Sequence, residues 1–286
     1  MFIIRRHNIF PNEFPESWAS DWGEDEFGLW MAFTYKGVWQ AFRWCEPGLF
    51  LMGSPENEPE RKGDEVQHEV TLTEGYWIAD TPVTQALWQV VMDDNPSQFK
   101  GEENPVENVS WDDAQAFISK MNSMKADLKL CLPTETQWEY ACRAGTVTPF
   151  SWGEQIDSSQ VNFNGLHPYS NGRKSEDRNQ TVAVKALPCN NWGLYQMHGN
   201  VWEWCQDWYS SYPSQSVINP QGPEIGTYRV LRGGSWFYYD RSCRSAGRLS
   251  YGPSSRYNRF GFRLARSHRS VGGVIRETHG ALLSSN

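Results

Sequence analysis

The chain has 286 residues, a formal net charge of −8, 39% hydrophobic residues, 21% charged residues and a mean hydropathy of −0.65. These values are typical of a soluble globular protein, and no apolar run approaches the roughly 20 residues that a membrane span requires. An acidic chain lacks the basic surface that neutralises phosphates, so the composition excludes general nucleic-acid binding. Arg5 and Arg6 interrupt the apolar N-terminus and leave no core for a secretory signal, so we expect a cytoplasmic protein.

Residues 1–45 are predicted to form an N-terminal β-hairpin extension. Between residues 28 and 43, large and small side chains alternate around the dipeptide Lys36-Gly37. A two-residue turn suits this dipeptide because glycine accepts positive φ angles. The pattern therefore predicts two antiparallel strands.

Two short strands and three helices follow along the chain. Residues 46–54 form an apolar run between turn signals, and residues 66–72 alternate as a half-buried strand does. The helices are predicted to start near Thr84, Ser110 and Thr134. The last two starts have the capping-box pattern, Ser-Trp-Asp-Asp and Thr-Glu-Thr-Gln. We expect these helices to belong to the core.

Beyond Gly145 the chain is rich in Gly, Pro, Asn and Ser, and tryptophans recur. This composition predicts long ordered loops that are held by aromatic side chains. No repeat of fixed period and no break in composition requires a second domain. Residues 46–266 are therefore predicted to be one domain, followed by a C-terminal tail at residues 267–286.

Eight short motifs in this domain carry a resemblance to a known family. They are Phe50-Leu-Met-Gly-Ser54, Thr81-Pro-Val-Thr84, Pro105-Val-Glu-Asn-Val-Ser-Trp111, Leu132-Pro-Thr-Glu-Thr-Gln-Trp-Glu-Tyr-Ala141, Trp192-Gly-Leu, Met197-His-Gly-Asn-Val-Trp-Glu-Trp204, Arg232-Gly-Gly-Ser-Trp236 and Gly261-Phe-Arg263. Together they resemble the formylglycine-generating enzyme family, also called the sulfatase-modifying-factor family. The resemblance implies an α+β, C-type-lectin-like fold of the formylglycine-generating enzyme subtype, which is loop-rich and low in regular secondary structure.

The resemblance also implies a structural calcium ion at residues 196–203. Its ligands would fall on Gln196, Gly199, Val201 and Glu203, the middle two through carbonyl groups. The family usually has Asn or Asp where this chain has Gln196. Because a buried carboxylate needs a partner, the alternative is that Glu203 caps backbone amides or pairs with an arginine. No other cofactor is expected to be required.

The enzymes of this family oxidise a substrate cysteine with molecular oxygen and a copper ion held by two cysteine thiolates. In this chain the positions of those two cysteines, three and eight residues beyond Ser235, are occupied by Tyr238 and Cys243. The second cysteine is therefore present and the first is not. Cu(I) prefers thiolate sulfur, and a tyrosine hydroxyl stays protonated at neutral pH. We therefore expect a pseudo-enzyme, with a copper-dependent formylglycine-generating oxidase or a related oxygen-dependent enzyme as the alternative. No Cys-x-x-Cys motif or Cys-His arrangement is visible, so we expect free, mostly buried thiols.

Segment 237–260 has the composition of a binding surface. It contains six aromatic residues among serines, glycines, arginines and one asparagine, and it contains no Lys, Glu, Gln, Trp or Met. Antibody binding loops use the same residue types. We expect exposure and not a buried aromatic core, because no strand or helix period is present. Residues 240–266 contain seven arginines and only one acid, so we expect positive charge there unless the acidic remainder of the chain neutralises some of the arginines.

This segment also resembles the variable region of proteins that are diversified by retroelements, which lies near the C-terminal end of lectin-like folds. The resemblance divides the segment and its flanks into framework positions and variable positions. The framework positions are Trp236, Cys243, Arg244, Ala246, Arg248, Pro253, Arg256, Gly261, Phe262 and Arg263. The variable, ligand-binding positions are Phe237, Tyr238, Tyr239, Ser242, Gly247, Leu249, Ser250, Tyr251, Gly252, Ser255, Tyr257, Asn258, Arg259 and Phe260.

The sequence therefore favours a non-enzymatic protein that binds a ligand through segment 237–260. A protein or peptide is the expected ligand, because aromatic residues and arginines are typical of binding hot spots. We expect neither a nucleic acid nor a membrane as partner. A structural interaction domain is a further alternative, in which the N-terminal hairpin makes the main contact through Trp30 and Trp39.

Overall fold

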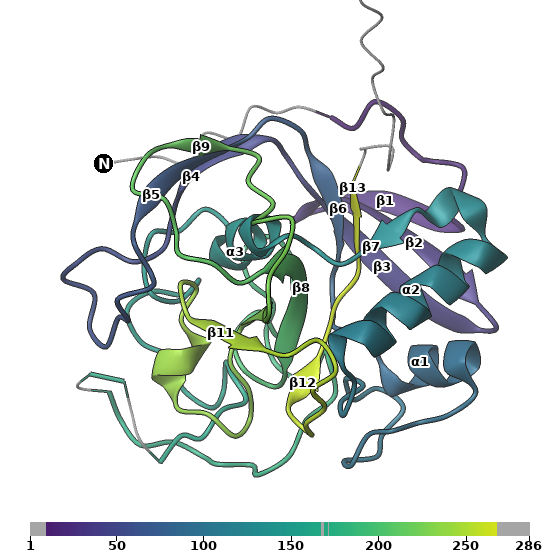
Figure 1. Cartoon of the computed structure of the whole chain (residues 1–286). Coiled ribbons are helices and arrows are strands. Elements are labelled where there is room, and N and C mark those ends of the chain that lie inside the picture. The colour runs from purple at the N-terminus through teal and green to yellow at the C-terminus, as the bar shows by residue number, and fades with distance from the viewer. Residues whose placement is uncertain (1–9, 167–168, 171, 268–286) are drawn as a thin grey trace, which may run out of the picture.

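The computed structural model describes residues 10–166, 169–170 and 172–267, and these residues form three β-sheets and three α-helices joined by long loops (Figure 1). The predicted tail at residues 267–286 lies outside the described residues except for Ser267. None of the helices in the described ranges is long and apolar enough to cross a membrane. The cytoplasmic location stays a prediction.

The largest sheet has six strands in the order β1-β2-β3-β6-β13-β7. Their bounds are β1 (Asp21–Asp25), β2 (Gly28–Tyr35), β3 (Val38–Cys45), β6 (Tyr76–Ala79), β7 (Leu130–Cys131) and β13 (Ala265–Ser267). The predicted hairpin is confirmed as β2 and β3, and both turn residues, Lys36 and Gly37, have positive φ angles of 46° and 83°. Strand β3 pairs with β6, so the hairpin continues the sheet of the domain and is not a detached extension.

The three predicted helices are present as α1 (Gln85–Met92), α2 (Trp111–Met124) and α3 (Glu135–Arg143). Thr84 caps α1, and the capping boxes predicted at Ser110 and Thr134 are both formed. Helices α1 and α2 lie side by side against the six-stranded sheet (Figure 1), where Trp88 stacks on Phe117 with ring centroids 5.5 Å apart. This packing forms the larger hydrophobic core.

Two smaller sheets complete the domain. The three-stranded sheet contains β4 (Gly48–Met52), β5 (His68–Leu72) and β9 (Val217–Ile218), and the four-stranded sheet contains β8 (Trp202–Trp208), β10 (Arg229–Arg232), β11 (Arg248–Tyr251) and β12 (Phe260–Gly261). Strands β4 and β5 are the strands predicted at residues 46–54 and 66–72. Short 3-10 helices are η1 (Ala126–Leu128) and η2 (Asp240–Cys243).

The predicted loop-rich texture is confirmed. Between α3 and β8, the described residues form only turns, bends and isolated β-bridges. The four-stranded sheet and the loop after β10 carry segment 237–260 near the lower edge of the molecule in Figure 1.

Candidate ligand-binding surface

The backbone of segment 237–260 is held from outside the segment. The amide of Asn164 donates to the carbonyl of Tyr238 over 2.9 Å, and the amide of Trp202 donates to the carbonyl of Arg259 over 2.8 Å. The amide of Asn108 donates in the same way to the carbonyl of Tyr257 over 3.0 Å. These bonds use main-chain carbonyls, so they do not depend on which side chain each position carries.

Most predicted variable positions are accessible. Phe237 is 52% exposed, and Tyr239 and Tyr257 are each 37% exposed. The half-buried positions are Tyr238, Ser242, Leu249, Ser250, Tyr251, Gly252, Ser255, Asn258 and Arg259. The segment is therefore no buried aromatic core, and the expected exposure is confirmed for twelve of the fourteen positions.

The structure contradicts the expectation of exposure at the other two positions. Phe260 is 0% exposed, because it is part of β12 and packs edge-on against Trp204 at a centroid distance of 5.4 Å. Gly247 is also buried, and a Cβ atom there would lie 2.8 Å from the carbonyl oxygen of Ser242. At Gly252, by contrast, the nearest atom to such a Cβ is a side-chain oxygen 3.6 Å away. Phe260 and Gly247 are therefore buried, as most of the predicted framework positions are.

Five of the accessible residues form one connected patch, which we call the aromatic face: Phe237, Tyr238, Tyr251, Tyr257 and Arg259. Ring centroids are 5.8 Å apart for Phe237 and Tyr238, and 5.4 Å apart for Tyr251 and Tyr257. The guanidinium of Arg259 joins the two pairs, at 5.3 Å from the ring of Phe237 and 4.4 Å from the ring of Tyr257. Aromatic pairs and cation–π contacts of this kind prearrange large apolar area for binding.

The remaining variable positions surround this face or lie on other elements. Tyr239 and Ser242 are on or beside η2, where the guanidinium of Arg241 lies 5.8 Å from the Tyr239 ring. The Asn258 amide donates to the Gln98 side chain over 2.9 Å.

Three of the four predicted framework arginines, Arg244, Arg248 and Arg263, point away from the surface and into buried ion pairs, whereas Arg256 is exposed. Arg244 bonds Glu65 over 2.7 Å, and Arg248 bonds Glu135 over 2.7 Å. Burial alone would lower the pKa of Arg244, but hydrogen bonds and charge from Glu65 and Glu58 raise it above its usual range. The acidic remainder of the chain thus neutralises these arginines, so the segment presents less positive charge than its composition suggests.

The residues expected to bind calcium do not fit that ion. Both carboxylate oxygens of Glu203 are bonded to Arg263 at 2.6 and 2.7 Å, and one of them also accepts from the Trp138 indole. The amide nitrogen of Gln196 is buried without a partner. A guanidinium this close repels a cation, so the geometry matches the alternative, in which Glu203 pairs with an arginine. Across residues 10–166, 169–170 and 172–267, no group of three or more His, Cys, Asp or Glu side chains is arranged to hold a metal.

The two positions that correspond to the copper ligands do not fit a copper ion either. The Tyr238 ring packs edge-on against Trp202, with centroids 5.6 Å apart. Cys243 is fully buried, and this burial raises the pKa of its thiol well above its usual range. The chain therefore offers one buried cysteine and one tyrosine at positions where the family's enzymes hold copper with two cysteines.

A Cys-His pair that the sequence did not reveal lies in the core. The Cys142 sulfur lies 3.6 Å from Nε2 of His198, although the two residues are 56 positions apart. Burial raises the pKa of Cys142 to about 12 and lowers the pKa of His198 to about 4. Both groups are therefore neutral at pH 7, and this pair lacks the thiolate that nucleophilic catalysis needs.

Three residues that no sequence pattern indicated, Trp111, Trp208 and Arg229, lie together beside the aromatic face. Arg229 lies between the rings of Trp111 and Trp208, at 3.7 and 3.4 Å from their centroids. Arg229 is directly opposite Tyr251 in the pairing of β10 with β11, so both side chains are on the same side of the sheet. No local pattern indicates this, because Trp111, Trp208 and Arg229 come from separate elements.

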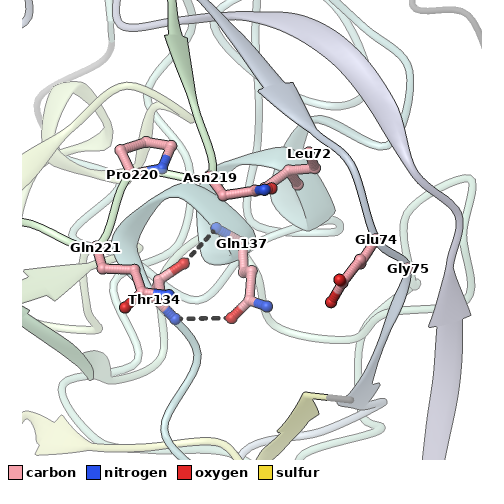
Figure 2. A pocket seen from close by; sticks show the side chains of 8 residues that line it. All are labelled: Leu72, Glu74, Gly75, Thr134, Gln137, Asn219, Pro220 and Gln221. Atoms are coloured by element: carbon pink, nitrogen blue, oxygen red, sulfur yellow. Dashed lines mark hydrogen bonds between the residues drawn. The ribbon is translucent and has the colours of Figure 1, made fainter. Parts of the chain in front are cut away.

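A small pocket lies elsewhere, and Figure 2 shows its lining. Its residues come from the β5–β6 turn, the start of α3 and the chain after β9, namely Leu72, Glu74, Gly75, Thr134, Gln137, Asn219, Pro220 and Gln221. Thr134 and Gln137 use their side chains in the capping box of α3, as the dashed lines in Figure 2 mark. No residue of segment 237–260 lines this pocket.

Sequence comparison relates the chain to known proteins. Residues 36–268 match the Sulfatase-modifying factor enzyme 1-like domain. A formylglycine-generating enzyme of Mus musculus is 35% identical over 211 residues, which cover 70% of this chain and 54% of that protein. One of Streptomyces coelicolor is 37% identical over 193 residues, which cover 63% of this chain and 59% of that protein. The chain thus spans about half the length of these curated relatives.

Structural comparison gives two further likenesses. Treponema denticola variable protein 1 has a TM-score of 0.70 at 28% identity, covering 83% of this chain and 98% of that chain. PvdO from Pseudomonas aeruginosa has a TM-score of 0.66 at 23% identity, covering 87% of this chain and 98% of that chain. The predicted fold, a loop-rich C-type-lectin-like fold of this subtype, is confirmed.

Proposed function

The chain belongs to the sulfatase-modifying-factor family, and we propose that it is a member that binds a protein or peptide through segment 237–260 and oxidises no cysteine. The observation that carries this proposal is the aromatic face. The backbone that carries its side chains is fixed, because its carbonyl groups accept hydrogen bonds from the amides of Asn108, Asn164 and Trp202. Such an arrangement lets side chains change while the surface keeps its shape.

The separation of framework from surface supports diversification of this segment. Framework side chains such as Arg244 and Arg248 are buried in ion pairs, and a Cβ at Gly261 would lie 2.6 Å from the Val106 carbonyl oxygen. The accessible positions have no comparable constraint. The likeness to a protein named Treponema denticola variable protein 1, at 28% identity, supports a variable segment in this chain.

Sequencing this gene from sister isolates tests the diversification. We expect substitutions to gather at the twelve accessible positions and to spare Gly247 and Phe260, which are buried. Substitutions spread evenly along the chain would refute the diversification.

The oxidase alternative rests on the curated relatives, which are formylglycine-generating enzymes. It predicts stoichiometric Cu(I) binding that alkylation of thiols abolishes, and oxygen uptake with a cysteine-containing peptide. We expect neither result, because Tyr238 and the buried thiol of Cys243 supply no pair of thiolates. The Tyr238→Cys variant is the matched control, since it restores the residue type at that position.

The hairpin alternative also has a structural basis. Trp39 is 44% exposed, and its ring lies 6.3 Å from that of Trp30. A phage-displayed library of random linear peptides, captured on the whole protein, separates the two surfaces. Alanine at both Tyr238 and Tyr257 should abolish capture, and Trp39→Ala should leave it intact. The opposite result would favour the hairpin.

A further inference from the structure

Arg259 differs from the other arginines between residues 240 and 266. Six of those seven arginines form ion pairs, from Arg241 with Glu60 to Arg266 with Glu16. Arg259 has no carboxylate oxygen within 4.0 Å in the part of the chain that the structure describes, and its Nε is buried without an acceptor. Of the guanidinium nitrogens of Arg259, only Nε is shielded in this way, so a ligand would meet the two terminal Nη groups.

The rings of the aromatic face hold Arg259 in a fixed orientation. Its guanidinium carbon lies 4.4 Å from the ring centroid of Tyr257, 5.3 Å from that of Phe237 and 5.9 Å from that of Tyr238. Stacking of this kind uses the flat faces of the guanidinium and leaves the N–H groups at its edge available. Because the group is already ordered, a ligand that binds it loses little side-chain entropy.

We propose that Arg259 is the anchoring subsite for a carboxylate of the protein or peptide ligand, with apolar ligand groups packed on the surrounding rings. The proposal rests on the proposed function and names the chemistry that the aromatic face recognises. A planar carboxylate matches the forked N–H groups of a guanidinium and forms two parallel hydrogen bonds with it. The carboxylate comes from an Asp or Glu side chain or from the ligand's C-terminus.

Two neighbouring arginines show why the subsite is specific to Arg259. Arg256 is more exposed, but its Nε and Nη2 donate to the two carboxylate oxygens of Asp113, at 2.6 and 2.7 Å. Arg229 is also stacked on rings, and its Nε also lacks an acceptor, but its Nη1 donates to the carbonyl of Gln206 over 2.6 Å, whereas no terminal nitrogen of Arg259 has such a bond in the described residues. A nucleic acid would need several neighbouring cations for its phosphates, whereas this face offers one unpaired guanidinium.

Capture of phage-displayed random linear peptides by the whole protein tests the proposal. The peptides retained by the wild type should share one Asp or Glu, or a preference for a free C-terminus, next to an aromatic or aliphatic residue. Synthetic copies carrying Asn or Gln at that position, or a C-terminal amide, should bind about 10- to 100-fold more weakly. The two kinds of synthetic copy distinguish a side-chain carboxylate from a terminal one.

Variants of the protein provide the matched controls. R259Q should weaken binding of the acidic peptides by the same factor, and it should bind the acidic and neutralised copies equally. R259K should recover little of the affinity for the acidic peptides, because an ammonium group lacks the forked N–H donors of a guanidinium. R256Q removes the same charge from the same segment and should bind as the wild type does, and thermal unfolding checks that each variant is folded.

The outcomes separate this inference from the proposed function. Peptides retained without a shared carboxylate, or equal losses in R256Q and R259Q, would overturn the subsite and leave the binding surface standing. If the wild type retains no more peptide than the double alanine variant of Tyr238 and Tyr257, the proposed function fails as well.

Discussion

Phe260 and Phe237 belong to the same segment, but they should respond in opposite ways to replacement by alanine. Phe260 is 0% exposed, and its ring contacts Trp204, Tyr251 and Tyr257 at centroid distances of 5.4, 5.0 and 5.0 Å. Removing a ring this buried lowers the free energy of unfolding by about 3 to 5 kcal/mol, through lost transfer energy and the cavity left behind. At about 2 to 4 °C per kcal/mol, the melting temperature should fall by about 6 to 20 °C.

Phe237→Ala is the matched control, because it removes the same ring from a position that is 52% exposed. Its effect on the free energy of unfolding should stay within about 0.5 kcal/mol, although capture of peptides should weaken. Thermal unfolding followed by circular dichroism, with urea titration at one temperature, measures both variants. A melting temperature for Phe260→Ala within about 2 °C of the wild type would refute the burial of Phe260.

Three further predictions concern buried groups. Gly247→Ser should lower the free energy of unfolding by about 1 to 3 kcal/mol, because the Cβ of the serine would lie 2.8 Å from a backbone oxygen. Gly252→Ser is the control and should be nearly neutral. Equal urea midpoints for the two variants would contradict this prediction. Burial, with a smaller contribution from Glu135, raises the pKa of Asp207 to about 7, so the folded state keeps a proton that the unfolded state releases above its usual pKa of 3.8. The free energy of unfolding of the wild type, relative to that of Asp207→Asn, should therefore fall by about 3 kcal/mol between about pH 5 and pH 8. Urea titrations that give the same difference between the two proteins at both pH values would exclude this. Burial raises the pKa of Cys142 to about 12, so iodoacetamide should label this thiol only after unfolding, and mass spectrometry of native protein that finds it labelled would contradict the burial.

Local signals in the sequence were sufficient for the three helices, the β2–β3 hairpin and strands β4 and β5, but not for the other strands. The capping boxes at Ser110 and Thr134 formed as predicted, because a cap bonds within one helical turn. The turn at Lys36-Gly37 was equally local. The exposure of segment 237–260 was also predictable, because its residue types are those of adaptable binding loops.

The sequence could not show which partners lie far along the chain. Arg244 bonds Glu58 across 186 positions, and Asn258 bonds Gln98 across 160 positions. The segment therefore looked more basic than its surface is. Strand β12 has only two residues, too few for an alternating pattern to separate buried Phe260 from exposed Tyr257.

The long-range ion pairs bear on the proposed function, because they separate positions that hold the fold together from positions at the surface. Removing one partner of a buried pair leaves an uncompensated charge, so positions such as Arg248 and Arg263 tolerate little change. Tyr238 is different, since its backbone carbonyl bonds the amide of Asn164 and its ring is half-buried at the surface. Under the proposed function, a tyrosine at the position where the family's enzymes have a copper-binding cysteine would remove that ligand, and its ring belongs to the aromatic face. Such a replacement leaves the buried ion pairs intact, so loss of the oxidase chemistry and gain of a binding surface can follow from the same substitution.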